Sequence, residues 1–131
     1  MIRSAELGKE YLDGDRIVTQ GDPADSMFFI QQGTVEVYME TSSGRVHLSE
    51  LGPGDIFGEM SLFTRLPRSA TVAAKGRARV LTLDKRGFLR RIHEDPSLAF
   101  RMLKKLSERV MALNEEVIRL QGGHLDPKPA P

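Results

Sequence analysis

Turn-forming residues recur at short intervals through the first half of the chain, and this spacing constrains the fold more than any other feature. Glycine tolerates positive φ, and short polar side chains bond nearby backbone, so clusters of the two favour chain reversal. Such clusters stand at 13–15, 21–23, 32–33, 42–44 and 52–55.

The runs between these turns are short and rich in β-branched and aromatic residues. Residues 34–40 alternate apolar and polar positions, as a half-buried strand does. Many short strands at this spacing predict an antiparallel sandwich or barrel. The other strands are expected at 16–19, 27–30, 46–51, 69–74 and 77–83.

The periodicity changes to that of helices after residue 84. Residues 85–93 indicate a short helix that ends before Pro96, and Pro96 suits the first turn of a longer helix. In that longer helix the apolar residues are spaced alternately three and four apart, as in a coiled coil. We call these six residues the seam: Leu103, Leu106, Val110, Leu113, Val117 and Leu120.

The seam predicts a helix that packs on the barrel and also meets a partner helix. A homodimer through 103–120 is therefore expected, and the alternative is a helix that packs on its own barrel alone. The chain of 131 residues fits one domain, which we assign to 1–121, and the Gly- and Pro-rich residues 122–131 are expected to form a loose tail.

Composition narrows the kinds of site that are possible. The chain has no cysteine, which excludes disulfides and thiolate metal sites. Its three histidines, His47, His93 and His124, stand far apart without the spacing of metal ligands, so no metal site is expected.

Charge and hydropathy give expectations about partners. The formal net charge is +1, which selects neither nucleic acid nor an anionic membrane. No run of about 18 apolar residues is present to span a membrane, and the first residues lack the apolar core of a signal peptide. We therefore expect a cytoplasmic protein without a membrane partner.

The segment 57–72 carries the most chemistry. Residues 59–63 can form one helical turn, whose free N–H groups and partial positive charge favour an anion. Arg68 offers a planar fork of donors suited to phosphate oxygens, Ser69 adds a hydroxyl, and Glu59 can accept from hydroxyls. Together these groups suit a sugar phosphate; the alternative is a simple ion pair between Glu59 and Arg68.

This segment resembles the phosphate-binding cassette of cyclic nucleotide-binding domains, which occur in catabolite activator proteins, regulatory subunits of protein kinase A and cyclic nucleotide-gated channels. The matching residues are Phe57-Gly58-Glu59-Met60-Ser61-Leu62 and Pro67-Arg68-Ser69-Ala70-Thr71. The resemblance covers about residues 9–121. It implies a mainly β fold, an eight-stranded antiparallel, jelly-roll-like β-roll with a short phosphate-binding helix and a long C-terminal lid helix.

The resemblance also implies roles for individual residues. Arg68 pairs with the cyclic phosphate, Ser69 donates to a phosphate oxygen, and Glu59 accepts from the ribose 2′-hydroxyl. The backbone around three further residues lines the sugar and the phosphate: Gly58, Met60 and Ser61.

Two further expectations concern the base. In the family, threonine at the position of Ser69 is associated with cGMP, so the serine favours cAMP as the ligand, with cGMP as the second possibility. Alignment on Pro96 puts Leu113 and Asn114 near the lid position, where the Asn114 amide could read the adenine edge. The alternative for Asn114 is a solvated position beside the seam.

Two other functions stay open at this point. One is a metal-dependent enzyme of the cupin type, which is also a β-roll but needs clustered metal ligands. The other is the sensor fragment of a DNA-binding transcription regulator, although the residues after Leu120 are too few for a recognition helix, so no nucleic-acid partner is expected. We favour a binding module that is not an enzyme and needs no cofactor.

Overall fold

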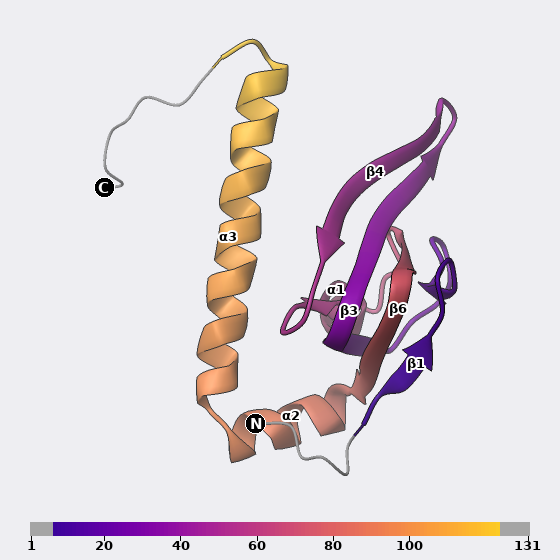
Figure 1. The fold of residues 1–131 in the computed structure, drawn as a ribbon. Helices are drawn as coiled ribbons and strands as arrows, with labels where there is room; N and C mark the ends of the chain where they lie inside the picture. The colour runs from indigo at the N-terminus through magenta and orange to yellow at the C-terminus, as the bar shows by residue number, and fades with distance from the viewer. Residues whose placement is uncertain (1–6, 124–131) are drawn as a thin grey trace, which may run out of the picture.

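The computed structural model describes residues 7–123, and Figure 1 shows their arrangement. Within this range the chain forms six strands and then ends in helices, with one short helix inserted among the strands. The elements are β1 (Lys9–Tyr11), β2 (Arg16–Val18), β3 (Ser26–Thr41), β4 (Gly44–Leu51), β5 (Ile56–Phe57), α1 (Glu59–Thr64), β6 (Thr71–Asp84), α2 (Lys85–Glu94) and α3 (Ser97–Leu120).

The two long strands β3 and β6 form the spine of the roll. They pair with each other in antiparallel fashion from Ser26 opposite Asp84 to Tyr38 opposite Thr71. The short strands attach to this spine: β1 and β2 pair with β6, whereas β4 and β5 pair with β3. Every pairing is antiparallel, so the predicted mainly β architecture with C-terminal helices is confirmed.

The described residues form six strands where eight were expected. The structure joins the strands predicted at 27–30 and 34–40 into β3, and those predicted at 69–74 and 77–83 into β6. The glycines between them, Gly33 (φ 84°) and Gly76 (φ 75°), bend the strands without ending them. Opposite Gly33 the register shifts, because extra residues of β6 bulge there.

Two apolar clusters hold the molecule together. The first fills the roll and is built around fully buried residues such as Ile30, Val35 and Val80. The second lies between the roll and the helices, where Met27 and Ile56 meet Leu62 of α1 and Met102 of α3. This second cluster fixes both α1 and the start of α3 against the sheet.

The C-terminal helices occupy the predicted ranges. The Asp84 side chain caps α2 by accepting from the Gly87 N–H at 2.7 Å, and α3 begins directly after Pro96. In Figure 1, α2 lies under the roll and α3 stands beside it. The seam is largely uncovered in this single chain: all of its residues except Leu106 are more than half exposed.

A glycine pair tests the bend in β3. A Cβ on Gly33 would lie 2.2 Å from the carbonyl oxygen of Arg77, whereas a Cβ on Gly14, which has nearly the same φ of 85°, would meet nothing within 4 Å. Gly14→Ala should cost about 1–2 kcal/mol, the strain of the left-handed region. Gly33→Ala should lower the free energy of unfolding by at least about 2 kcal/mol more, because backbone must move. Urea denaturation of both variants measures the difference, and equal losses would show that the close approach is unimportant.

Candidate functional site

Arg68 lies at the centre of the predicted cassette, with both its main chain and its side chain held in place. Its N–H donates to the Asp22 carbonyl at 2.9 Å, and its carbonyl accepts from the Gly21 N–H at 2.8 Å. The turn at 21–22 therefore fixes the start of the segment that leads into β6. The side chain points inward and is only 7% exposed.

The guanidinium of Arg68 is bonded to neutral groups. It donates to the Gly58 carbonyl at 3.1 Å and to the Ser26 hydroxyl at 3.4 Å. It also lies 5.2 Å from the centroid of the Phe28 ring, which stacks on Phe57. Three neighbouring elements, β3, β5 and the N-terminus of α1, thus orient its fork of donors.

Among residues 7–123, no carboxylate lies close enough to form an ion pair with Arg68. Burial lowers the pKa of Arg68, while the more distant charges of Asp25 and Glu59 act in the opposite direction. A buried cation without a bonded anion is costly and favours binding of an anion from solution. The alternative of a Glu59–Arg68 ion pair is therefore wrong.

Glycine is required where α1 begins. Gly58 has φ 79°, and a Cβ there would lie 2.6 Å from Nη1 of Arg68 and 3.2 Å from the Phe28 ring. No side chain caps α1 at this end. The first-turn N–H groups of α1 consequently lack a side-chain acceptor beside the Arg68 guanidinium, and both features favour an anion.

Glu59 is 8% exposed and pairs with a cation from α3. Nη1 of Arg109 lies 3.1 Å from the Glu59 carboxylate, and Nη2 of Arg109 donates to the Ile56 carbonyl. Nearby, Lys105 pairs with Asp55 at 2.9 Å. We call Lys105–Asp55 and Arg109–Glu59 the docking pairs, because they tie α3 to the roll beside the cassette.

The docking pairs are a feature that the sequence prediction missed. Lys105 and Arg109 are four residues apart and so lie on one face of α3. This spacing of two cations on one side of the helix, with Arg109 flanking the apolar seam, is the signal that could have indicated a second interacting face. Which carboxylates they would meet could not be read from a separation of fifty residues.

The other predicted site residues differ in how far they are exposed to solvent. Ser61 lies on the buried side of α1 at 4% exposure, whereas Met60 is 63% exposed and Ser69, which follows Arg68, is exposed. Asn114 is exposed on α3, just over one turn beyond Arg109. Its side chain forms no hydrogen bond within the described part of the chain, so the structure leaves it apart from the cassette.

The structure also bears on the expected metal and membrane partners. Within residues 7–123, no three His, Asp or Glu side chains gather where they could hold a metal ion, and His124 lies outside this range. The helices in the same range include none that is long and apolar enough to cross a membrane. Most of the predicted tail, residues 124–131, also lies outside the described residues.

Comparison with known proteins identifies the family. Residues 8–95 match the family model of the cyclic nucleotide-binding domain. The chain therefore belongs to the cyclic nucleotide-binding domain family, and the resemblance drawn from the cassette is confirmed. It is a cyclic nucleotide-binding regulatory domain with the β-roll fold of that family.

Individual relatives agree with this assignment. Over 75 residues the chain is 47% identical to the cAMP-dependent protein kinase type II regulatory subunit of Drosophila melanogaster. The matched segment is 57% of this chain and only 20% of that protein. The catabolite activator protein of Thermus thermophilus superposes with a TM-score of 0.74 and 28% identity, over 89% of this chain and 56% of that one. The regulatory domain of Toxoplasma gondii PKA, solved with cAMP, superposes with a TM-score of 0.62 and 28% identity. The match covers 76% of this chain and 38% of that one.

The docking pair Lys105–Asp55 should make the structure sensitive to acid. Partial burial alone would raise the pKa of Asp55, but the Gly52 N–H, Lys105 and the charge of Arg109 outweigh it and hold that pKa below its ordinary value. A carboxyl with a depressed pKa contributes stability above its unfolded pKa of about 3.9 and loses it as the pH falls through the lower folded pKa. Below about pH 4, stability should therefore decline, and less so in Asp55→Asn.

Thermal unfolding of both proteins between pH 6 and pH 2.5 measures this effect. Lys105→Met is the matched variant, because it keeps the carboxyl and removes the cation that faces it. Its acid decline should also be shallower than that of the unmodified protein. Identical pH profiles in all three proteins would contradict a stabilising role for this pair.

Proposed function

We propose that this domain is a cAMP sensor that binds the nucleotide at Arg68 and Glu59 and couples binding to the position of α3. The observation that carries the proposal is the buried Arg68 guanidinium, which has no carboxylate partner among residues 7–123 and faces the uncapped start of α1. A cyclic phosphate supplies the single negative charge that this position needs.

The individual roles follow from the geometry around the guanidinium. Arg68 presents a fork of donors to two phosphate oxygens, and Ser69 adds its exposed hydroxyl. The backbone of Gly58, Met60 and Ser61 lines the phosphate and the ribose. Glu59 accepts from the 2′-hydroxyl, since its carboxylate is held beside the start of α1 by Arg109.

The choice of cAMP over cGMP is supported by the relatives and by one residue. The Drosophila protein is named for its dependence on cAMP, and the Toxoplasma domain was crystallised with it. Ser69 stands where a threonine is associated with cGMP in this family. Tighter binding of cGMP than of cAMP would overturn this part of the proposal.

Coupling to α3 is supported by the double use of Glu59. The carboxylate expected to bind the ribose is the one that Arg109 of α3 already contacts. A ligand in the cassette would meet Arg109 through this shared group and so shift the balance between docked and undocked α3. With the nucleotide bound, Asn114, just over one turn farther along α3, would cover the base.

The exposed seam supports dimerisation as the response to a movement of α3. Its six residues form an apolar stripe on α3 that the roll does not cover apart from Leu106. A second copy of the chain could bury this stripe against its own. Dimerisation through 103–120 and ligand binding would then be linked, and the linkage would act in both directions.

Calorimetric titration with cAMP tests the site. Arg68→Leu removes a buried charge-assisted bond worth about 1.5–3 kcal/mol, so the affinity should fall about tenfold to a hundredfold or more. Arg86→Leu is the control, because it removes the same charge from an exposed position on α2. Glu59→Gln should cost less affinity, since the only ligand contacts it weakens are those to a hydroxyl, although it also removes the ion pair with Arg109. An unchanged affinity in Arg68→Leu would contradict the role assigned to Arg68. In a separate test, chromatography after incubation should return the nucleotide as unhydrolysed cAMP.

Hydrogen exchange and light scattering test the coupling. Saturating cAMP should slow amide exchange in residues 100–120, because a docked helix opens less often. Scattering should report a dimer that Val110→Glu and Val117→Glu weaken, since each puts a charge into the seam. Unaltered exchange would rule out the lid, and a monomer with and without cAMP would reduce the seam to a packing stripe. The cytoplasmic location and the lack of a nucleic-acid partner remain predictions.

A further inference from the structure

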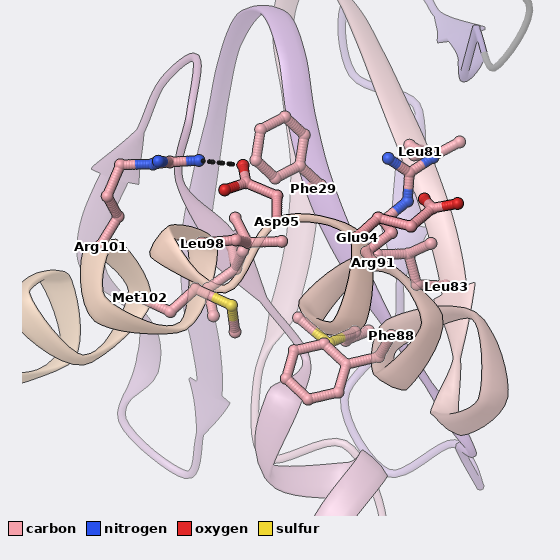
Figure 2. Close-up of a pocket in the computed structure, with 12 residues that line it drawn as sticks. Phe29, Leu81, Leu83, Phe88, Arg91, Glu94, Asp95, Leu98, Arg101 and Met102 are labelled. Atoms are coloured by element: carbon pink, nitrogen blue, oxygen red, sulfur yellow. Dashed lines mark hydrogen bonds and ion pairs between the residues drawn. The ribbon is translucent and has the colours of Figure 1, made fainter. Parts of the chain in front are cut away.

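A second concave site lies away from Arg68, where α2 turns into α3. The hollow there has a volume of about 180 Å³ and opens between the helices and the roll. Its floor is apolar and includes Met27, Phe29, Phe88 and Met102. Figure 2 shows Arg101 and Asp95 on one side of this hollow and Arg91 and Glu94 on the other.

The rim does not select a charged ligand. Arg101 and Asp95 pair with each other at 3.2 Å, and among the described residues that line the hollow two arginines are matched by two carboxylates. An ion placed on the apolar floor would lose its hydration without gaining an excess of opposite charge. A neutral molecule avoids that cost and still displaces water from apolar surface.

The lining favours an aromatic ring over an aliphatic chain. The sulfur atoms of Met27 and Met102 make favourable contacts with ring edges, and Phe29 and Phe88 can stack on a ring or meet it edge to face. An apolar cavity of about 150 Å³ is large enough to bind benzene. The hollow at the elbow is therefore large enough for one ring or two small fused rings.

We propose that the hollow at the α2–α3 elbow is a second ligand site, which binds a neutral aromatic molecule of one or two rings. Such a molecule contacts the roll and α3 at once. The walls of the hollow also adjoin the cassette. Phe88 packs edge-on against Phe63 of α1, and the carbonyl of Ile56 accepts a hydrogen bond from Arg109. A bound ring would thus stabilise the docked position of α3 without touching Arg68.

Methyl NMR with indole as the probe tests this site directly and without cAMP. The six methionines of the chain supply the signals, and a bound ring shifts the methyl groups that it faces. The ε-methyl signals of Met27 and Met102 should shift and reach saturation, whereas those of Met60 and Met111, both 63% exposed, should stay in place. Absent shifts up to the solubility limit of indole, or shifts of all four methyls without saturation, would overturn the proposal.

A blocking variant and a matched control complete the experiment. Leu98→Trp should fill the hollow with its own ring and abolish the shifts of Met27 and Met102. Leu103→Trp adds the same ring to a position on α3 that is 63% exposed and does not line the hollow, so the shifts should persist. If loss of signal dispersion shows that Leu98→Trp does not fold, Leu81→Trp provides the same block from β6. Persistent shifts in a folded blocking variant would refute the site.

Discussion

The buried guanidinium of Arg68 is the constraint around which the rest of the site is arranged. It has to be oriented by neutral groups, so the Gly58 carbonyl and the Ser26 hydroxyl face it and the Phe28 ring lies beside it. This in turn requires a glycine where α1 starts, because a Cβ would collide with the guanidinium. The turn that precedes β3 and the entry into β6 then fix the main chain on either side. One uncompensated cation thereby explains the local form of four separate elements.

A second level of organisation connects this site to α3. The helix makes polar contacts with the roll through the docking pairs and apolar contacts through Met102, while most of the seam stays exposed. Ion pairs at a partly exposed surface are worth little individually, so the docking pairs add little to the free energy that holds α3 on the roll. Such a balance suits a regulatory domain, because a ligand can move a helix only when the two positions differ by little free energy.

The sequence predicted the parts of this arrangement that local chemistry determines. The change from strand to helix near residue 84 and the short helix at α1 both follow from spacing and residue type, whereas the anion-binding role of Arg68 stays a prediction. The strand count did not follow, because a glycine in a strand run predicts a turn, whereas Gly33 and Gly76 only bend β3 and β6. The partner of Glu59 was also out of reach, since it depends on where α3 lies in space.

The long pairing of β3 with β6 has a consequence for how the domain comes to exist. Ser26 and Asp84, which are far apart in the sequence, are paired directly, whereas β3 and β4 pair through a tight local turn. Contacts between distant segments form slowly, because the chain entropy of the loop is lost before the contacts are gained. On a ribosome, the β3–β4 hairpin can form early, but the spine waits for β6 to emerge. Arg68 reaches its buried position only then, so the binding site is among the last parts of the molecule to be assembled.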